Sequence, residues 1–316
     1  MKCILSHTDD PYFNLAAEEY LLKSFDEEFY FQYVNRPAVV VGKHQNALAE
    51  VDQDYLEEND ILLARRISGG GAVYHDPGNM NYSFITNESP GDFIKFKKYT
   101  APVILALENL GVEARLGSRN ELLAGVRKIS GTASHVFKRR VLHHGTLLYE
   151  TDLERLGKCL YIELGRYRDK AVKSIRSEVI NISTIMEQPV PAADFYQAVF
   201  DHIAGSEHQV ISFSKDDTRA IEKLVTEKFS SWEWNYGYSP KYEIEHSTSM
   251  DGELVRFNLQ VNKGIITSAE IMGGAVAGRI GHLLTGVRHD RVIVEGVLEK
   301  EGIDADWQQV ILRGLF

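Results

Sequence analysis

Three consecutive glycines, Gly69, Gly70 and Gly71, separate two strand-like segments and follow the pair Arg65-Arg66. Glycine has no Cβ and tolerates positive φ, so consecutive N–H groups of such a loop can converge on an anion that side chains would push away. The alternative is a tight hairpin with solvated arginines, because isolated glycine-rich matches are common. The run therefore predicts two strands joined by a loop that can approach a phosphate closely.

Composition excludes several classes of protein. The 316 residues exceed one usual domain, so a large domain and a smaller one are expected. Cys3 and Cys159 lie far apart and no signal-like N-terminus precedes them, which predicts a cytoplasmic protein without a disulfide framework. No run approaches the ~18 apolar residues of a membrane span. The formal net charge of -10 argues against general affinity for nucleic acid, and Lys138-Arg139-Arg140 is the best short candidate for a local basic patch.

Hydrophobic periodicity predicts a mixed α+β domain in the first two thirds of the chain. Helices are expected over 14–22, 52–59, 99–110 and 152–160. Strands are expected over 29–34, 38–41, 61–67, 72–75, 81–86, 113–116, 121–124, 128–133 and 142–149. This order is typical of a mixed sheet with helices packed on it.

A domain boundary is expected between residues 237 and 238. Aromatic density rises over 231–237, and the pattern there changes to that of strands. Residues 255–261 and 265–271 alternate around Asn262-Lys263-Gly264, which predicts a hairpin. Short helices are expected from Ala275, the last over 306–315. The predicted fold class is α+β, with a large mixed-sheet domain over 1–237 and a small α+β accessory domain over 238–316.

Two further clusters place polar side chains on strands. Lys128 begins a strand and precedes Ser130-Gly131, so its ammonium can reach a phosphate or carboxylate while the small residues leave space for a ligand. The alternative is an ordinary surface lysine. His143 and His144 are adjacent on a strand and point to opposite faces, which makes the pair a poor metal chelate. One histidine is expected to contact a ligand and the other to be structural or exposed.

Five ordered motifs resemble those of the lipoate-protein ligase A family. They occupy 65–76, 128–133, 143–148, 174–181 and 231–237. Order and spacing agree from Asn14 to about Gly237, and the later hairpin is similar to the family's small C-terminal domain. The resemblance implies that residues 1–237 form a catalytic domain of the biotin/lipoate ligase type, shared with biotin ligases and octanoyltransferases. It also implies that the accessory domain is mobile.

The resemblance implies an ATP-dependent enzyme that activates free lipoate to lipoyl-AMP. The lipoyl group would then pass to the ε-amine of a lysine on an acceptor domain. ATP and Mg²⁺ are the implied substrate and activator, no cofactor is permanently bound, and the metal ligands stay undetermined. The implied partners are lipoate and apo lipoyl domains of 2-oxoacid dehydrogenase or glycine-cleavage proteins. Neither nucleic acid nor a membrane is among them, and a monomer is expected.

The resemblance also implies roles for particular residues. Lys128 resembles the family lysine that touches both the lipoate carboxyl and the α-phosphate, and it is the predicted catalytic residue. The implied ATP and adenylate contacts are Arg66, Gly71, Ala72, Val73, Tyr74, Asn79, Asn120 and Lys128. The implied lipoate contacts are Ser68, Gly69, Gly70, His75, Lys128 and His144.

Three alternatives remain. A cysteine-dependent octanoyl or lipoyl transferase of the same fold requires an activated thiol, yet neither Cys3 nor Cys159 lies in a glycine-rich, basic motif. Biotin ligation requires that family's arginine-rich phosphate loop, whereas this loop contains Ser68 and three glycines. A non-catalytic lipoate-binding protein would keep the fold, but the presence of Lys128 together with an intact glycine loop argues against it.

Overall fold

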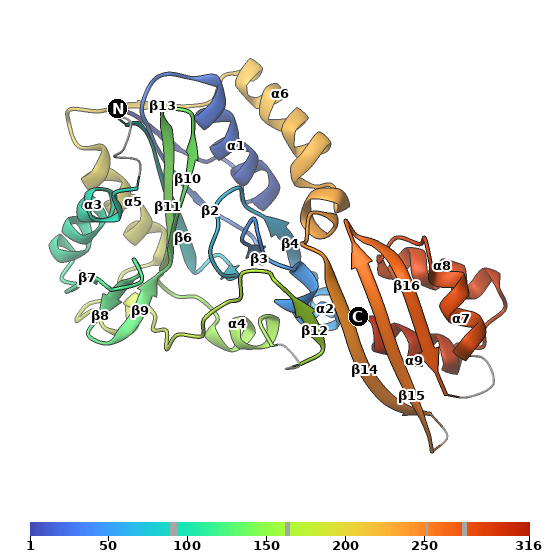
Figure 1. Cartoon of the computed structure of the whole chain (residues 1–316). Helices are drawn as coiled ribbons and strands as arrows, with labels where there is room; N and C mark the ends of the chain where they lie inside the picture. The colour runs from blue at the N-terminus through green and yellow to red at the C-terminus, as the bar shows by residue number, and fades with distance from the viewer. Residues whose placement is uncertain (89–93, 162–164, 251, 274–276) are drawn as a thin grey trace. The chain divides into compact units, whose positions relative to one another are not determined.

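The computed structural model divides into two compact units whose segments alternate along the chain (Figure 1). It describes residues 1–88, 94–161, 165–250, 252–273 and 277–316. Unit 1 comprises Met1–Lys43, Asp60–Lys158 and Ser174–Ser231, and unit 2 comprises His44–Asn59, Cys159–Lys173 and Trp232–Phe316. The sequence predicts one boundary after residue 237, whereas two earlier segments also belong to unit 2. Local periodicity predicts a helix or a strand, but it does not reveal which core the segment joins.

A six-stranded mixed sheet forms the centre of unit 1, in the order β10-β11-β6-β2-β1-β13. Its strands are β1 (Lys2–Leu5), β2 (Phe29–Val34), β6 (Asn79–Asn87), β10 (Thr132–Phe137), β11 (Arg140–Leu148) and β13 (Gln209–Ile211). β1 is parallel to β2 and β13, and the other neighbours are antiparallel. The short strands β1 and β13 are absent from the sequence prediction.

Helices cover both faces of this sheet (Figure 1). On one face lie α3 (Phe96–Asn109) and α5 (Ala192–Ala204), and on the other α1 (Pro11–Ser24) and α6 (Lys215–Leu224). Tyr30 of β2 packs in the core with Val103 of α3 and Val199 of α5. Asp10 starts α1, because its carboxylate accepts hydrogen bonds from the first backbone N–H groups of the helix.

Two three-stranded sheets complete the β-structure of unit 1. One has the order β4-β3-β5 and the other β7-β8-β9. Their strands are β3 (Ala38–Val41), β4 (Leu62–Arg65), β5 (Val73–His75), β7 (Arg115–Leu116), β8 (Leu122–Ala124) and β9 (Arg127–Ser130). The single strand predicted over 128–133 is therefore two strands that break at Gly131. Helical segments also occur at α4 (Leu153–Cys159), Ile182–Thr184 and Val225–Phe229.

Unit 2 is built on a four-stranded antiparallel sheet in the order β12-β14-β15-β16. Its strands are β12 (Tyr167–Asp169), β14 (Tyr242–Met250), β15 (Glu253–Asn262) and β16 (Ile265–Met272). Its helices are Ala47–Ala49, α2 (Gln53–Glu58), α7 (Ala277–Leu284), α8 (Arg291–Lys300) and α9 (Ala305–Leu315). The predicted hairpin over 255–271 is confirmed, with Val255, Phe257 and Leu259 in the core.

The last segment of unit 2 begins with a helical turn instead of a strand. The prediction that a strand pattern starts within residues 231–237 is wrong. Glu233–Gly237 is a π-helical turn, and β14 begins only at Tyr242. Trp232 stacks on Tyr236 across that turn, with ring centroids 6.1 Å apart. Ala275 lies outside the described residues, and helices follow from Ala277 as expected. Among the residues that the structure describes, none of the helices combines the length and hydropathy needed to cross a bilayer.

Candidate active site

The glycine-rich loop, residues 66–72, joins two strands that do not pair with each other. β4 is parallel to β3 and β5 is antiparallel to it, so β3 lies between them and the loop crosses the end of β3. The hairpin alternative is therefore wrong. Gly42 follows β3 and permits the crossing, because a Cβ there would lie 2.1 Å from the carbonyl oxygen of Gly70. Gly70 itself has φ +95°, which glycine adopts without strain.

Arg66 holds this loop in shape. Its Nε donates to Ser68 Oγ at 3.0 Å, and its Nη1 donates to the Val40 carbonyl oxygen at 3.0 Å. Its Nη2 donates to the carbonyl oxygens of Gly69 at 2.7 Å and Gly71 at 2.8 Å. Burial lowers the pKa of Arg66 to about 10, so the side chain keeps its charge at neutral pH. Arg66 therefore stabilises the conformation of the loop that is predicted to bind nucleotide.

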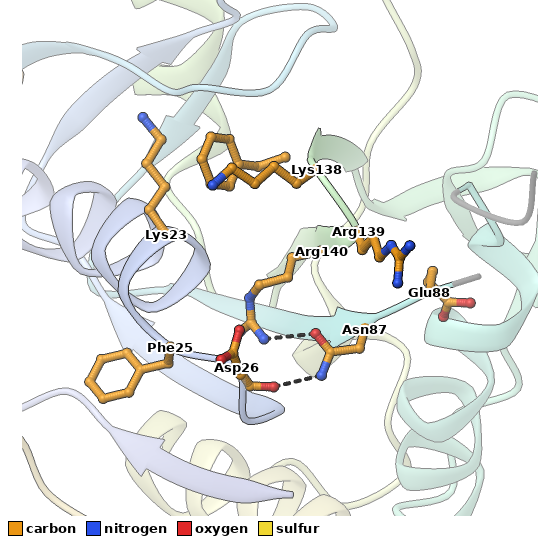
Figure 2. A pocket seen from close by; sticks show the side chains of 9 residues that line it. Lys23, Phe25, Asp26, Asn87, Glu88, Lys138, Arg139 and Arg140 are labelled. Atoms are coloured by element: carbon orange, nitrogen blue, oxygen red, sulfur yellow. Dashed lines mark hydrogen bonds between the residues drawn. The ribbon is translucent and has the colours of Figure 1, made fainter. Parts of the chain in front are cut away.

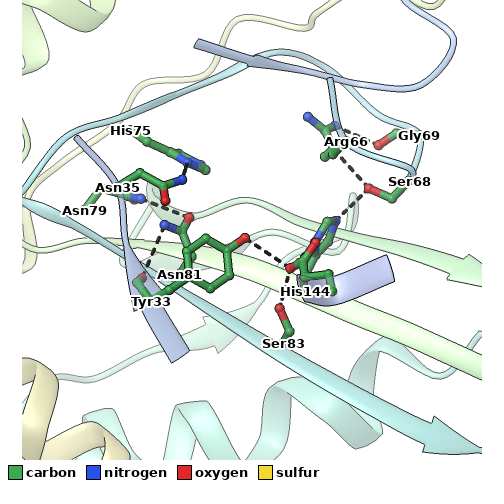
Figure 3. Close-up of polar contacts among 11 residues, drawn as sticks. Tyr33, Asn35, Arg66, Ser68, Gly69, His75, Asn79, Asn81, Ser83 and His144 are labelled. Carbon is green, nitrogen blue, oxygen red and sulfur yellow. Dashed lines mark hydrogen bonds and ion pairs between the residues drawn. The ribbon is translucent and has the colours of Figure 1, made fainter. Parts of the chain in front are cut away.

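Ser68 connects the loop to a buried polar network (Figure 3). Its Oγ lies 2.6 Å from Nε2 of His144, and Nδ1 of His144 lies 2.9 Å from a carboxylate oxygen of Glu18. Tyr33 and Ser83 donate their hydroxyl groups to the same carboxylate. Because a carboxylate only accepts, a neutral His144 carries its proton on Nδ1 and accepts the Ser68 hydroxyl at Nε2. The network fixes the orientation of both side chains.

The neighbouring His143 points away from this network. Its Nδ1 lies 2.6 Å from Ser134 Oγ, and its ring stacks on Tyr99 of α3 with centroids 4.1 Å apart. The prediction that the two histidines face opposite sides of the strand is therefore confirmed. His144 faces the loop, and His143 packs against a helix on the other face.

A second series of hydrogen bonds orients His75. Asn14 Nδ2 donates to the carbonyl oxygen of Thr8 at 3.1 Å and to Asn35 Oδ1 at 2.8 Å, which fixes the orientation of both amides. Asn35 Nδ2 then lies 2.9 Å from Nδ1 of His75. An amide nitrogen only donates, so Nδ1 of His75 accepts and Nε2 carries the hydrogen.

His75 is a neutral and unsatisfied hydrogen-bond donor. Burial, together with the nearby Arg66 and His144, lowers the pKa of its ring to about 3. Within the described residues, the buried Nε2 has no hydrogen-bond partner. A buried polar group without a partner costs free energy, so such a group at this place indicates a ligand contact.

The network of Glu18 and the hydrogen bonds that run from Asn14 to His75 both begin on the same helix. Asn14 and Glu18 are four residues apart in α1, so they lie on one helical face, and both are fully buried. The sequence analysis includes Glu18 only within the expected helix 14–22 and does not assign Glu18, Tyr33 or Asn35 to the site. Two polar residues at this spacing on a face that is otherwise apolar are the signal that identifies them.

Asn79 begins β6 next to this network. Its Nδ2 donates to Asn81 Oδ1 at 3.1 Å, and Asn81 in turn donates to the carbonyl oxygen of Tyr33 at 3.4 Å. The Oδ1 atom of Asn79 is buried and has no partner in the described parts of the chain. Figure 3 shows Asn79 and His75 on the same side of the network.

Lys128 lies on β9 with its ammonium group over Gly131. A Cβ on Gly131 would be 3.2 Å from Nζ, so this glycine makes room for the ammonium itself. Burial lowers the pKa of Lys128; Glu121 opposes that shift, and the cations Arg119 and Arg66 reinforce it. No hydrogen bond or ion pair engages Nζ within the described ranges. Positive charge thus exceeds negative charge around Lys128, which favours an anionic ligand.

The segment 174–180 links the loop to Lys128. Ala72 donates its backbone N–H to Ser174 Oγ at 2.9 Å. The backbone N–H of Lys128 donates to the Glu178 carbonyl oxygen at 2.8 Å, and that of Ile180 donates to the Lys128 carbonyl oxygen at 3.0 Å. The motif at 174–181 therefore lies beside two of the other motifs. Sequence reasoning quoted this motif but missed the contact of Ser174 with the loop.

The remaining predicted nucleotide contacts lie on adjoining elements. Asn120 has φ +65° in the turn between β7 and β8, and its carbonyl oxygen accepts a hydrogen bond from Thr132. Val73 and Tyr74 belong to β5, which is an edge strand of its three-stranded sheet.

Both cysteines are buried, Cys3 in unit 1 and Cys159 in unit 2. Cys3 lies in the core of unit 1, where burial raises the pKa of its thiol. Cys159 is a buried residue at the end of α4. A raised pKa keeps a thiol protonated and unreactive. These positions do not fit a thioester intermediate.

Comparisons with known proteins identify the family of the chain. The model of the lipoyl protein ligase A/B catalytic domain matches residues 10–204. The chain is 39% identical over 302 residues to lipoate-protein ligase LplJ of Bacillus subtilis, which covers 92% of this chain and 91% of the relative. The chain belongs to the lipoate-protein ligase A family. This assignment confirms the resemblance on which the predicted residue roles depend, although the roles themselves stay predictions.

Solved structures of lipoate ligases share the fold. A structure of lipoate-protein ligase A bound with ATP has a TM-score of 0.64 and 28% sequence identity, over 75% of this chain and 98% of that chain. A bi-partite lipoate protein ligase, studied with its E2 lipoyl domain from Thermoplasma acidophilum, has a TM-score of 0.64 and 27% identity. It covers 75% of this chain and 96% of that chain. The predicted α+β fold of the biotin/lipoate ligase type is confirmed.

Proposed function

We propose that this chain is an ATP-dependent lipoate-protein ligase that converts free lipoate to lipoyl-AMP and then lipoylates a lysine of an acceptor domain. It is an enzyme that forms an amide bond, as its family membership indicates. The observation that carries the proposal is the ammonium of Lys128, which has no partner among the described residues and lies in the same unit as the glycine-rich loop that Arg66 binds. Unit 1 would hold the catalytic site, and unit 2 would serve as the accessory domain.

Activation is needed because a carboxylate is a poor electrophile. The lipoate carboxylate attacks the α-phosphorus of ATP, a C–O–P linkage forms, and pyrophosphate leaves. Two anions must approach each other in this step, and Lys128 between them turns their repulsion into attraction. Lys128 and the backbone amides of the glycine loop would also stabilise the charge that develops on the α-phosphate.

The geometry supports a division of contacts within the site. We assign the nucleotide to Arg66, Gly71, Ala72, Val73, Tyr74, Asn79, Asn120 and Lys128. We assign lipoate to Ser68, Gly69, Gly70, His75, Lys128 and His144. The unsatisfied Nε2–H of His75 is suited to an acyl or phosphate oxygen. The donors of Arg66 are used on the loop, so its contribution to nucleotide binding would be the shape and charge of that loop.

Mg²⁺ would reach the site with the phosphates of ATP. Among the described residues there is no cluster of three or more His, Cys, Asp or Glu side chains arranged to hold a metal ion. Mg²⁺ usually keeps several waters and binds phosphate oxygens with few protein ligands, which fits a site of this kind. It would neutralise the leaving pyrophosphate.

Transfer to the acceptor completes the reaction. The ε-amine of an acceptor lysine attacks the lipoyl carbonyl, a C–N bond forms, the bond to AMP breaks, and the amine proton leaves to solvent. Burial of the adenylate would limit its hydrolysis. The archaeal relative was studied with an E2 lipoyl domain, which supports a lipoyl domain as acceptor class. We propose apo lipoyl domains of 2-oxoacid dehydrogenase or glycine-cleavage proteins as partners and a monomeric enzyme.

The test is to incubate the purified protein with lipoate, Mg-ATP and an apo lipoyl domain. We expect release of AMP and a mass gain of one lipoyl group on the acceptor, both dependent on ATP. Absence of lipoylation where a known ligase succeeds would exclude the proposal. ATP-independent transfer from an acyl carrier would favour the cysteine-dependent transferase, and lipoate binding without adenylate would favour a non-catalytic binding protein.

A further inference from the structure

A hollow of about 670 Å³ opens at the tip of the β10–β11 hairpin in unit 1, apart from the site described above (Figure 2). Its lining includes Lys23 at the end of α1 and the hairpin residues Phe137, Lys138, Arg139 and Arg140. The short basic run of the sequence therefore forms part of a concave surface. The three basic residues of that run have different roles.

Arg140 is part of the framework of the hollow. It is buried, and its Nε donates to the Leu22 carbonyl oxygen at 3.0 Å while Nη2 donates to that of Glu27 at 2.8 Å. Its Nη1 donates to Asn87 Oδ1 at 2.9 Å. A cation that binds the last carbonyl groups of a helix stabilises its C-terminus. Arg140 thus fixes the hairpin to the end of α1.

Lys138 and Arg139 are available to a partner. Both are exposed, and neither forms an ion pair within the described residues. Lys138 has φ +55° at the turn, which positions its side chain beside the Phe137 ring with Nζ 5.2 Å from the centroid. Lys23 approaches the same ring at 5.3 Å. Two ammonium groups thus lie near the Phe137 ring at the rim of the hollow.

The acidic residues near the hollow do not cancel this charge. Glu88 lines it, but Lys98 binds Glu88 at 2.6 Å and Lys95 lies 3.8 Å from it. Asp26 also lines it and lies near Arg140. Among the described residues, no carboxylate pairs with Lys138 or Arg139, whereas Glu19 pairs with Lys23 at 2.6 Å.

Positive charge continues from the hollow toward the glycine-rich loop. Lys43 and Lys23 are close enough to His135, on β10, to reinforce the lowering of its pKa by burial, which Glu19 opposes. Lys43 donates its backbone N–H to the carbonyl oxygen of Ser68 at 2.8 Å, so it adjoins the loop. We call the surface formed by Lys43, Lys23, Lys138 and Arg139 the basic track. It begins at the candidate active site and ends at the hairpin tip.

We propose that the basic track docks an acidic face of the protein acceptor and so directs the acceptor lysine toward the adenylate. This proposal rests on the proposed ligase function. From Thr132 to Phe137 the strand rises about 17 Å at about 3.3 Å per residue. A domain of about 100 residues has a radius of gyration of about 13 Å, so one small acceptor can contact the tip and the site together.

The charge of the whole chain makes such a patch selective. The chain carries a formal net charge of -10, so its net charge repels an acidic partner. A local basic track then favours one orientation of approach, and rim charges of this kind act on association and on its salt dependence. A free amine has no acidic face and would not use the track.

The test compares Lys138→Glu/Arg139→Glu with the wild-type enzyme. The probes are an acidic apo lipoyl domain and Nα-acetyl-lysine amide as a small amine acceptor. We expect the KM for the domain to rise about tenfold, since each exposed ion pair contributes modestly. Transfer to the small amine and lipoate-dependent ATP–pyrophosphate exchange should stay unchanged. Added salt should raise the KM of the wild type more than that of the variant.

The matched control is Lys263→Glu/Lys241→Glu in unit 2. Lys263 also sits at a hairpin turn with positive φ, at +49°, and both control lysines are exposed. An equal rise in KM for the control, or an unchanged KM for the hairpin variant, would overturn the docking proposal. A loss of ATP–pyrophosphate exchange in the hairpin variant would also overturn it, because the hollow would then serve the nucleotide step. Absence of exchange in the wild type would instead refute the ligase function.

Discussion

The carboxylate of Glu18 lies 2.9 Å from Nδ1 of His144, and the two residues are separated by 126 positions in the chain. The other ring nitrogen of His144 lies 2.6 Å from Ser68 Oγ in the glycine-rich loop. A helix, a strand and a loop are thus joined by one buried network. Its members constrain one another, because each hydrogen-bonding group is satisfied by the next.

Glu18→Ala should therefore disturb both the loop and the fold. The substitution leaves the donors of Tyr33, Ser83 and His144 without their acceptor, and each unsatisfied buried donor costs about 1–3 kcal/mol. We expect a lower urea midpoint and a higher KM for lipoate. The control is Glu19→Ala, whose ion pairs join the more exposed Lys23 and Lys228. An unchanged KM for lipoate in Glu18→Ala would show that this network does not affect lipoate binding.

Lys128→Ala should strongly slow adenylate formation while the protein stays folded. Loss of a group that stabilises developing charge reduces rate by about 10²- to 10³-fold, and we expect such a fall in lipoate-dependent ATP–pyrophosphate exchange. Removal of a partly desolvated, unpaired charge should not lower the urea midpoint. Arg127→Ala, an exposed neighbour on the same strand, is the control. Exchange at wild-type rate in Lys128→Ala would remove this lysine from its proposed role.

Gly42→Ala should displace the glycine-rich loop. A Cβ at this position would meet the carbonyl oxygen of Gly70 at 2.1 Å, and the bonds of Arg66 to the carbonyl oxygens of Gly69 and Gly71 oppose a shift of the loop. We expect a strong loss of exchange activity and a higher KM for ATP. Gly157→Ala in α4 is the control, because nothing lies within 4 Å of its added Cβ. Equal activity in the two variants would show that the crossing does not shape the site.

His75 should act through its Nε2–H group rather than as a base. Nδ1 accepts from Asn35, so the ring offers a donor at the site. His75→Gln can place an amide N–H near the position of Nε2, whereas the shorter side chain in His75→Asn cannot. We expect the glutamine variant to retain much of the lipoate-dependent exchange and the asparagine variant to lose it. The reverse order of activities would refute the assigned tautomer.

Unit 2 should lose stability in mild acid because of His289. Burial lowers the pKa of His289 to about 3, from an ordinary value of 6.5. The unfolded chain therefore binds a proton that the folded chain excludes, and stability falls as pH falls from 6.5 toward 3. The slope is about 1.4 kcal/mol per pH unit for one such histidine. Urea unfolding can be followed by the fluorescence of Trp232, Trp234 and Trp307, which all lie in unit 2.

His289→Gln should flatten this pH dependence between 6.5 and 4. His289 accepts from the Tyr242 hydroxyl at Nδ1 and donates from Nε2 to the Leu315 carbonyl oxygen, so the variant also loses some stability at pH 7. The slope, rather than the absolute stability, is the relevant readout. His282→Gln, on the exposed side of α7, should keep the wild-type slope. A wild-type slope in His289→Gln would assign the acid sensitivity to other groups.

The sequence by itself determined the family, the α+β class and the order of the motifs. Three patterns are local: glycines before a strand, a lysine at the start of another strand and paired histidines in a third. Each can be interpreted from a few adjacent residues. Alternation also predicted that His143 and His144 would face opposite sides, because side chains of a strand alternate. These patterns involve residues that are close together in the chain, so the sequence alone reveals them.

Only the tertiary structure decided which distant groups meet. Asn14 and Glu18 look like part of an amphipathic helix until Asn35 and His144 are placed beside them. Gly42 shows no motif, yet its missing Cβ lets the loop cross β3. The assignment of 44–59 and 159–173 to unit 2 likewise follows from packing. Hydrogen bonds and packing act over a few ångströms in space, whereas periodicity records only separation along the chain.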